Sequence, residues 1–560
     1  MRTSPAERTA SYRKKGWWRG ITIDALFREA VAAHADDEAL VDPPNKEALV
    51  GLPPKRLTYR ELDREVDRMA AAFRELGVGP DDVVLAQLPN IVEGVIVYLA
   101  CARTGAILSP VAMTYRGHEL RQILPTVEPK LFFTVASFNG ADQSALALGL
   151  ARDGVLSAPI LCAGSAAPEG AVALDGFDIP ADPPGTSPEI DAADVLTICW
   201  TSGTEAAPKG VPRHHDHWVV NGEAMVEMAE LREGDTLLNP FPLINIAAFG
   251  GMVVPWLLCK GRFVQHHPFD LPIFLQQLAT EHVNYTVAPP AILTMLLKRS
   301  DLLADIDFSE LRCLASGSAP LAPFMVTEWQ ERFGVTIMNV FGSNEGASLI
   351  SSGSEVPDPE RRARYFPRFG ARGVEWASIF PNKVRTRLVD PETEEEITEP
   401  DRVGELRLDG AMVFDGYWRA PEMTKAAFDA DGWFRTGDLF VIAPKPDDRF
   451  YEFVGRNKDI VIRGGVNISP AEIDGLVEGH PQVQEACAVG YPDERLGERL
   501  CIFVVPKPGE SVSLDEICGY LREQDVAVVK LPEKLKVIDA LPRNALGKVL
   551  RRELKDAAAA

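Results

Sequence analysis

Residues 194–210 read DVLTICWTSGTEAAPKG, an apolar stretch followed directly by a loop of small, hydroxyl-bearing and glycine residues. The loop does not match the Walker A pattern, because Pro208 and Gly210 stand where that pattern needs Gly and Ser or Thr. Its composition still suits an anion, since glycines let backbone N–H groups approach phosphate oxygens, hydroxyls donate and Lys209 supplies a positive charge. On this segment alone, a phosphate-binding loop and a flexible surface turn both remain open.

The sequence before this loop alternates between strand and helix patterns. Thr58 and Glu61 have the spacing of a capping box, and apolar residues follow at helical intervals up to Leu76. Similar patterns predict strands at 81–89, 107–111 and 130–135 and helices at 90–106 and 117–127. Such alternation predicts a parallel sheet with helical crossovers, and these sheets bind ligands at the carboxyl ends of their strands. The position of the 201–210 loop therefore favours phosphate binding.

Composition bounds the class of protein. At 560 residues the chain is too long for one ordinary core, and its hydrophobic and charged fractions of 46% and 25% are those of a soluble globular protein. The formal charge of −23 opposes non-specific binding to nucleic acid or to an anionic membrane. An anionic ligand must therefore meet basic groups that are concentrated locally.

The cysteines and the apolar runs carry no targeting or metal signal. The 8 cysteines show no CxxC pair and no His/Cys spacing that holds zinc, which predicts reduced, mostly buried thiols in a cytoplasm. The basic N-terminus has no apolar region after it, so we do not interpret it as a secretory signal. The uncharged run 237–259 is long enough to span a bilayer but contains three prolines, and we expect it in the core.

Beyond Arg456 the sequence changes character. Segments 483–493 and 499–507 predict strands, and residues 513–524 predict a helix that Ser513 caps. About a hundred residues of this kind suit a small α+β domain. We predict an N-terminal domain over 1–457 and a C-terminal domain over 458–560.

Five short motifs follow one another along the chain, and their order is informative. They are TSGTEAAPKG (201–210), NVFGSNEG (339–346), WFRTGDL (433–439), GRNKDIVIRGGVNISPAEI (455–473) and LPRNALGKVLR (541–551). Together they resemble the motifs of the adenylate-forming superfamily of acyl-CoA synthetases, adenylation domains and luciferases, from about Leu57 to Arg552. The resemblance implies an α/β fold with a large N-terminal domain of layered sheets and helices and a small, mobile α+β C-terminal domain.

The resemblance also implies the residues of a nucleotide site. Activating a carboxylate joins it to the α-phosphate of ATP, and donors, cations and Mg²⁺ stabilise the charge that builds on phosphate oxygens. The implied catalytic residues are Lys548, Glu345 and Lys209. By the resemblance, Lys548 bridges the carboxylate and the α-phosphate, Glu345 binds Mg²⁺, and Lys209 binds the β- and γ-phosphates. Asp438 matches the aspartate that binds the ribose. The full implied ATP-binding set is Thr201, Ser202, Gly203, Thr204, Lys209, Phe341, Gly342, Asn344, Asp438, Arg456 and Lys548.

A second half-reaction needs a thiolate to attack the mixed anhydride. The resemblance implies that the small domain rotates about Lys458 for this step. It places Gly464 and Gly465 along the pantetheine tunnel for CoA, where a missing Cβ lets a narrow thiol arm pass. A tight turn is the alternative for these two glycines.

Several positions depart from the family pattern. Glu205 and Ala206 replace the last Thr and Gly of the usual Thr-Ser-Gly-Thr-Thr-Gly loop, which puts an anion beside phosphates. Asn344 replaces a threonine, although its amide can still donate to a phosphate oxygen. Asn245 stands where many relatives have a histidine beside the acyl pocket. Because of Glu205 and Asn344, a nucleotide-binding pseudoenzyme remains an alternative.

The positions expected to line the acyl pocket are mostly small or apolar. They suit a neutral hydrophobic acid better than a charged amino acid, and the segment 11–26 is similar to the openings of aryl-acid and cyclohexanecarboxylate activators. The candidates are Asn245, Phe249, Gly250, Ser316, Gly317 and Gly342, with Ala347 beyond Glu345.

We predict an AMP-forming carboxylic acid–CoA ligase that uses ATP, Mg²⁺ and CoA on a medium-chain, alicyclic or aromatic acid. An adenylation enzyme that loads a separate carrier protein, a luciferase-like oxygenase and the pseudoenzyme are the alternatives. His214, His215 and His217 lie just before a predicted helix, and we interpret them as structural rather than metal-binding. We expect a cytoplasmic enzyme that has no nucleic-acid partner and no integral membrane segment. By analogy with relatives, many of which are homodimers, a homodimer is the expected assembly.

Overall fold

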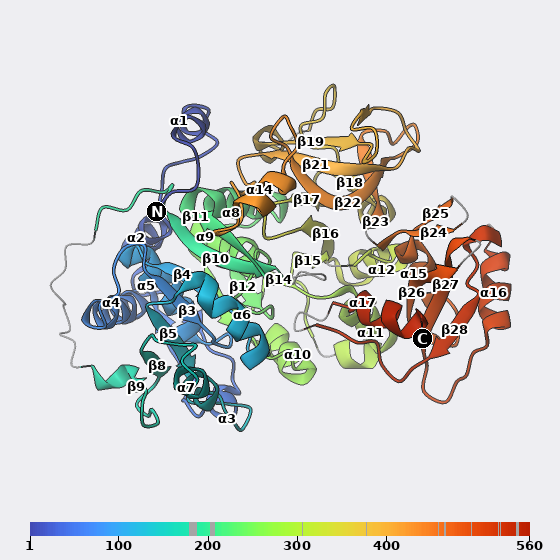
Figure 1. The fold of residues 1–560 in the computed structure, drawn as a ribbon. Coiled ribbons are helices and arrows are strands. Elements are labelled where there is room, and N and C mark those ends of the chain that lie inside the picture. Colours follow the sequence, from blue (N-terminus) through green and yellow to red (C-terminus); the bar gives the residue numbers. More distant parts are fainter. Residues whose placement is uncertain are drawn as a thin grey trace.

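The computed structural model describes most of the chain. The described residues are 1–177, 188–201, 208–304, 306–317, 319–376, 378–456, 459–463, 466–493, 496–524, 526, 528–544 and 548–559. An N-terminal part with layered sheets and helices lies beside a smaller C-terminal part, coloured red in Figure 1.

The strand before the 201–210 loop, β10 (Val195–Thr201), lies in a largely parallel sheet. β10 runs parallel to β4 and antiparallel to β11, so the chain returns along itself after the loop and Lys209 stands opposite Thr201. The sheet order is β11 (Lys209–His214), β10, β4 (Ile107–Pro110), β3 (Val83–Ala86), β5 (Leu131–Val135), β8 (Ile160–Ala163) and β9 (Val172–Ala173).

The helices of this region follow the sequence patterns. α4 (Tyr59–Glu75) begins after Thr58, and both hydrogen bonds of the predicted Thr58–Glu61 capping box are present. α5 (Val92–Thr104) is buried on every face, which explains why its sequence is apolar all round. The other helices and short strands of this region are α1 (Ala6–Lys14), α2 (Ile23–His34), α3 (Lys46–Val50), α6 (Gly117–Val127), α7 (Ser144–Arg152), β6 (Ser137–Phe138) and β7 (Ala141–Asp142).

A second sheet has parallel inner strands and antiparallel edges. Its order is β17 (Ser348–Ser351), β16 (Thr336–Gly342), β15 (Cys313–Gly317), β14 (Tyr285–Val287), β12 (Thr236–Asn239), β13 (Arg262–Gln265), β1 (Glu38–Val41) and β2 (Arg56–Thr58). The helices that precede or connect these strands are α8 (His215–Met228), η2 (Phe249–Val253), α9 (Val254–Cys259), α10 (Leu271–Thr280), α11 (Pro290–Lys298) and α12 (Pro323–Phe333). α13 (Pro359–Arg364) follows β17.

The third sheet is antiparallel throughout. Its order is β18 (Tyr365–Pro367), β23 (Phe450–Arg456), β22 (Phe434–Ile442), β21 (Gly404–Gly410), β19 (Val384–Val389) and β20 (Glu396–Ile397), and α14 (Pro421–Ala427) precedes β22.

The C-terminal part has its own sheet and its own apolar clusters, which within the described chain contain only residues from 461 onward. Ser513 and Glu516 form the predicted capping box at the start of α16. The elements are β24 (Val461–Arg463), β25 (Val466–Ile468), α15 (Pro470–Glu478), β26 (Val483–Asp493), β27 (Gly497–Pro506), α16 (Leu514–Glu523), β28 (Lys534–Val537) and α17 (Arg551–Ala559).

The structure confirms the predictions for the run 237–259 and for the cysteines and corrects the prediction for the stretch 163–187. The run 237–259 is core, as expected, and contains β12, η2 and α9; across the described residues no helix is both long and apolar enough to cross a membrane. The cysteines are unpaired and buried, as predicted. The stretch 163–187 is rich in Pro, Gly and Ala, a composition that predicts a surface connection. This prediction is wrong in part, since β9 extends the sheet at Val172–Ala173; residues 178–187 lie outside the described chain.

Candidate active site

The predicted site residues gather where β10, β15 and β16 end. β15 ends at Gly317 and β16 at Gly342, and the loop 343–347 follows. A Cβ on Gly317 would lie 2.1 Å from the Val340 carbonyl oxygen, so the close approach of β15 and β16 requires glycine there. Gly346 has φ +93° and lies against the Met412 carbonyl, which brings the segment 410–418 over this loop.

Glu345 is held by that segment. The Phe414 N–H donates to the Glu345 carbonyl oxygen at 2.9 Å, and the Tyr417 hydroxyl donates to Glu345 Oε1 at 3.0 Å. Burial, with the neighbouring carboxylate, raises the pKa of Tyr417, so the phenol keeps its proton. Lys209 Nζ lies 5.0 Å from the centre of the Tyr417 ring. Tyr417 therefore contacts both the predicted magnesium ligand and the predicted phosphate lysine.

Asn344 ties the 343–347 loop to its surroundings. Its side-chain nitrogen donates to the Trp200 carbonyl at 3.2 Å, and its side-chain oxygen accepts from the Ile246 N–H at 2.9 Å. The buried Arg213 donates to the Asn344 backbone carbonyl at 2.6 Å. These bonds leave one amide hydrogen of Asn344 for a ligand, so its contact with phosphate stays a prediction.

Phe341 is half-buried near the end of β16. Its ring packs edge-on against Phe440, with the ring centres 5.2 Å apart. This packing holds the Phe341 ring in place. Its contact with adenine remains a prediction.

Asp438 lies within β22 where the pairing with β21 shifts register, and neighbouring residues hold this irregularity in place. The Thr436 hydroxyl donates to the Leu406 carbonyl at 2.6 Å and accepts from the Asp438 N–H at 3.1 Å. Gly437 has φ +70° and donates its N–H to Glu405 Oε1 at 3.0 Å.

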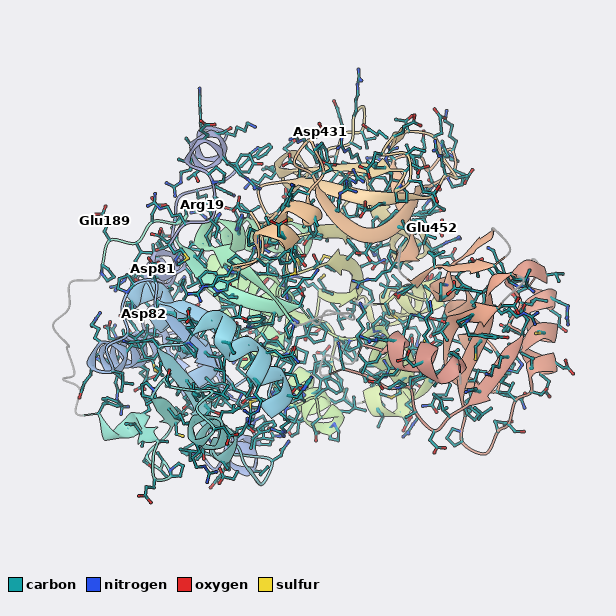
Figure 2. The ribbon with its side chains drawn as sticks, in the orientation of Figure 1. Arg19, Asp81, Asp82, Glu189, Asp431 and Glu452 are labelled. Atoms are coloured by element: carbon teal, nitrogen blue, oxygen red, sulfur yellow. The ribbon has the colours of Figure 1, made fainter. Side chains whose placement is uncertain are left out.

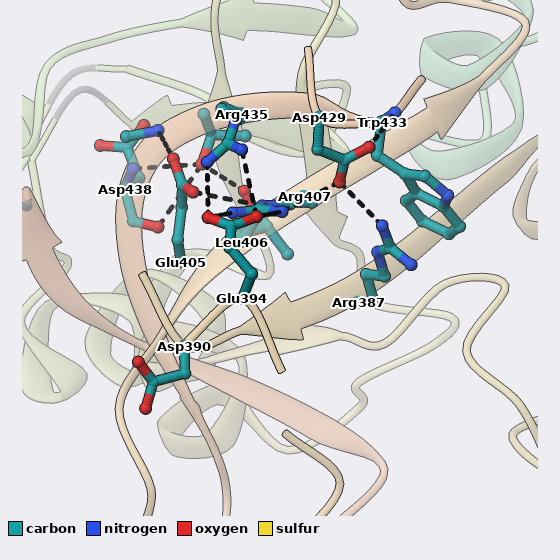
Figure 3. A network of polar contacts seen from close by, with 12 residues as sticks. Arg387, Asp390, Glu394, Glu405, Leu406, Arg407, Asp429, Trp433, Arg435 and Asp438 are labelled. Atoms are coloured by element: carbon teal, nitrogen blue, oxygen red, sulfur yellow. Dashed lines mark hydrogen bonds and ion pairs between the residues drawn. The ribbon is translucent and has the colours of Figure 1, made fainter. Parts of the chain in front are cut away.

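A network of ion pairs lies beside this register shift (Figure 3). The guanidinium of Arg407, 1% exposed, lies 3.2 Å from Glu405, 2.7 Å from Glu394 and 3.0 Å from Asp429. Arg435 shares Glu394, at 2.9 Å. Because a buried guanidinium needs carboxylate partners, Arg407 and Glu405 depend on each other for their positions.

Two cations act on the Asp438 carboxylate. Arg456 Nε donates to Asp438 Oδ1 at 3.0 Å, from the position opposite it in the β22–β23 pair. Burial raises the pKa of Asp438, while the positive charges of Arg456 and Lys548 lower it. Lys548 belongs to the C-terminal part, so this part lies close enough for its lysine to reach the predicted nucleotide site.

Lys548 itself is anchored by its backbone. Its N–H donates to Asn544 Oδ1 at 2.9 Å, and its carbonyl accepts from the Asn544 N–H at 2.8 Å. The basic residues Lys209, Arg456 and Lys548 thus concentrate at one region of an acidic protein. In Figure 2 the acidic side chains Glu189 and Asp431 lie at the outer edge of the molecule, whereas Glu452 lies near the junction with the C-terminal part.

The predicted acyl-pocket residues have structural tasks. Asn245 Oδ1 accepts from the Ala247 and Ala248 N–H groups at 3.1 and 3.2 Å, which caps the turn before η2. The Phe249 ring is fully buried between Tyr98 and Trp218, with ring centres 4.5 and 4.9 Å away, so it belongs to the core in this arrangement.

The two small candidates nearby also serve packing. A Cβ on Gly250 would lie 3.2 Å from Trp218 and from Asn221, so glycine lets η2 approach α8. The Ser316 hydroxyl donates to the Ala288 carbonyl at 2.8 Å. Their contact with an acyl group stays a prediction.

Some predicted residues lie outside the described chain. They are the loop residues Ser202, Gly203, Thr204, Glu205 and Ala206, the pivot Lys458 and the tunnel glycines Gly464 and Gly465.

Tyr417, Arg213 and Glu405 contact the site but were missed by the sequence reasoning. Glu405 lies in GELRLDG (404–410), where polar residues alternate with leucines as in an ordinary strand, and Tyr417 follows Gly416 in DGYW (415–418). Neither pattern distinguishes a site residue.

The donor set suits Mg²⁺, which prefers carboxylate and phosphate oxygens and keeps several waters. Glu345 offers one buried carboxylate whose described polar contact is the Tyr417 hydroxyl on Oε1. Glu345 would hold the ion together with substrate phosphates.

His214, His217 and Asp415 also bring ligand atoms within 4.8 Å of one another. The two rings stack with centres 3.4 Å apart and 18° between planes, so their in-plane lone pairs run side by side and do not converge. Arg8 already pairs with Asp415 at 2.8 Å. The geometry supports the structural interpretation. α8 begins at His215, so the histidines cap and start this helix rather than precede it.

Comparisons with known proteins agree with this architecture. Residues 27–418 match the AMP-binding enzyme family, and residues 472–548 match the AMP-binding enzyme C-terminal domain. The chain is 30% identical to a salicylyl-CoA synthase / salicylate adenylyltransferase of a Streptomyces species, over 99% of this chain and 96% of that protein. It is 31% identical to the medium-chain fatty-acid–CoA ligase of Escherichia coli, over 97% and 91%.

Solved structures give the same picture. ATP-bound MatB from Rhodopseudomonas palustris superimposes with a TM-score of 0.78 at 26% identity, over 96% of this chain and 99% of that chain. The chain belongs to the AMP-binding enzyme family. It is an AMP-forming acid–thiol ligase, and the resemblance and fold class predicted from the motifs are confirmed.

Proposed function

We propose that the protein is a carboxylic acid–CoA ligase that forms an acyl-adenylate from ATP and then an acyl-CoA. The observation that carries this proposal is that Lys548 lies near enough for its positive charge to lower the pKa of Asp438, which Arg456 also contacts. In this proposal the lysine of the C-terminal part and the carboxylate of the N-terminal part bind the same nucleotide. This arrangement suits the first half-reaction.

The chemistry assigns a task to each group. A carboxylate oxygen attacks the α-phosphorus, the bond to the β-phosphate oxygen breaks and pyrophosphate leaves; the CoA thiolate then attacks the acyl carbon and AMP leaves. Lys209 and Lys548 are the cations toward the phosphates, and Asp438 accepts hydrogen bonds from the ribose hydroxyls. Mg²⁺, when bound at Glu345, neutralises charge on the phosphate oxygens.

We infer a medium-chain, alicyclic or aromatic acid. The candidates at the strand ends are uncharged, and Ser316, Gly317 and Gly342 are small. Relatives named for salicylate, medium-chain fatty acids and indoleacetate, each 30–31% identical, support the same range.

A carrier-protein thiol is the second candidate acceptor. A 28% identical relative of Bacillus subtilis is named as a 2,3-dihydroxybenzoate–AMP ligase, a name that stops at the adenylate and specifies no thiol acceptor. The chemistry up to the adenylate is the same for both acceptors.

The test is mass spectrometry of products after incubation with ATP, Mg²⁺, CoA and a panel of short, medium-chain, alicyclic and aromatic acids. AMP with an acyl-CoA supports the proposal and identifies the acid class. AMP with an acyl-adenylate and no thioester identifies a carrier protein as the acceptor. Absence of AMP with every acid contradicts the proposed function and favours a pseudoenzyme.

A further inference from the structure

The N-terminal segment, residues 1–20, precedes the part of the chain that matches the family, which starts at residue 27. In Figure 1 it carries α1 on an arm beside α8 and β11. Despite its position at the end of the chain, the segment buries Trp18 completely and Ser4 to 8% exposure. Its contacts therefore belong to the folded core.

One set of these contacts reaches residues 410–415. Arg8 Nη1 donates to Asp415 Oδ1 at 2.8 Å, and Nη2 donates to the Gly410 and Val413 carbonyls at 3.0 Å each. The Ser4 hydroxyl donates to the other Asp415 oxygen. Trp18 Nε1 donates to the Ala411 carbonyl at 2.7 Å. The segment thus holds one stretch of backbone at several points.

That stretch continues directly into the site. Phe414 and Tyr417 bind Glu345, and the Trp418 N–H donates to the Gly210 carbonyl, next to Lys209, at 2.8 Å. The Tyr417 ring faces Lys209. Residues 410–418 are therefore the contact between the N-terminal segment and both the phosphate lysine and the magnesium carboxylate.

We propose that the N-terminal segment is a positioning element of the phosphate and magnesium site, with Arg8 and Ser4 holding Asp415 and thereby fixing the loop that orients Glu345 and packs on Lys209. The inference rests on the proposed function for the roles of Glu345 and Lys209. Asp415 is 5% exposed, so removing Arg8 takes a charged hydrogen-bond donor away from a buried carboxylate. The 410–418 loop should then shift to hydrate it.

The test compares Arg8→Gln with Arg13→Gln. Arg13 lies on the same helix but pairs with Asp191 and Asp216, away from the 410–418 loop, and so provides the matched control. The first readout is hydrogen exchange of the ligand-free protein. We expect exchange at the Phe414 and Trp418 amides to rise about tenfold or more in Arg8→Gln and to stay unchanged in Arg13→Gln.

The second readout is steady-state kinetics with Mg²⁺ and ATP varied. In Arg8→Gln we expect the KM for ATP and the Mg²⁺ concentration at half-maximal rate to rise about tenfold, with the KM for the acid within about twofold. Ser4→Ala, which removes only a hydroxyl, should give a smaller change in the same direction. It is the milder variant if Arg8→Gln folds poorly.

The inference would be overturned if hydrogen exchange at the Phe414 and Trp418 amides were unchanged in Arg8→Gln. If Arg8→Gln does not fold, the same result in Ser4→Ala would overturn it. Equal effects of Arg8→Gln and Arg13→Gln would also overturn it, since they would indicate general loss of stability. The failure of the proposed function is distinguishable, because then the wild-type protein forms no AMP with any acid.

Discussion

Asp438 and Arg456 stand opposite each other on β22 and β23, with Arg456 Nε 3.0 Å from Asp438 Oδ1. Arg456 is the last described residue of the N-terminal part before the predicted boundary. The pair therefore connects the proposed ribose carboxylate with the segment that leads into the C-terminal part.

Replacing Arg456 by Gln should weaken ATP binding. The substitution removes a cation that lowers the pKa of the buried Asp438, so this pKa rises further. We expect kcat/KM for ATP to fall about tenfold or more, with the acid limb of its pH profile moving to higher pH. Arg364→Gln, which loses an exposed contact with Glu452 on the same sheet, is the control. An unmoved acid limb would contradict the role of the pair.

Replacing Lys548 by Ala should abolish adenylation, because the cation toward the carboxylate and α-phosphate is lost. ATP–pyrophosphate exchange should fall by about 10³-fold or more. Lys555→Ala, which removes an exposed lysine of α17 paired with Glu498, should keep wild-type exchange. Exchange that survives in Lys548→Ala would refute the assignment of this lysine.

Substitutions of Glu405 show whether its hydrogen bond to the Gly437 N–H positions Asp438. Glu405→Leu removes the acceptor for the Gly437 N–H and one partner of Arg407, whereas Glu405→Gln keeps an acceptor oxygen. We expect the KM for ATP to rise about tenfold in the Leu variant and less than about threefold in the Gln variant. Equal KM values in the two variants would show that the hydrogen bond does not position Asp438.

His215 should make stability depend on pH. Burial lowers its pKa to about 4, and its Nδ1 accepts from the Ile23 N–H at 3.1 Å, so the folded protein keeps it neutral. The unfolded chain binds the extra proton below about pH 6.5, so its contribution is fully present above that pH and is lost progressively down to about pH 4.

His215→Asn keeps an acceptor for the Ile23 N–H but cannot titrate. Between pH 7 and pH 5 the wild type should lose about 2 kcal/mol more of its free energy of unfolding than this variant. Urea unfolding at both pH values measures the difference. His282→Gln, at an exposed histidine, should behave as the wild type, and an unchanged pH dependence in His215→Asn would contradict the account.

The local elements could be predicted from sequence because their signals are local. The Thr58–Glu61 capping box and the apolar strand 195–200 depend on neighbours within a few residues. Motif order predicted Glu345, Asp438 and Lys548 as site residues, but the residues that contact them come from distant segments.

Tyr417 lies 72 residues from Glu345 along the chain, and Ser4 lies 411 residues from Asp415. No spacing rule joins such pairs. The fully buried Phe249 shows the converse, since its position along the chain suggested an acyl contact while its packing places it in the core.

The most direct test of the central claim is the transfer of oxygen from the acid to AMP. The enzyme is supplied with ATP, Mg²⁺, CoA and an accepted acid labelled with ¹⁸O in both carboxylate positions, and AMP is analysed by mass spectrometry. Attack of the carboxylate on the α-phosphorus predicts AMP that carries one ¹⁸O atom. Unlabelled AMP from the same reaction would contradict activation through an acyl-adenylate.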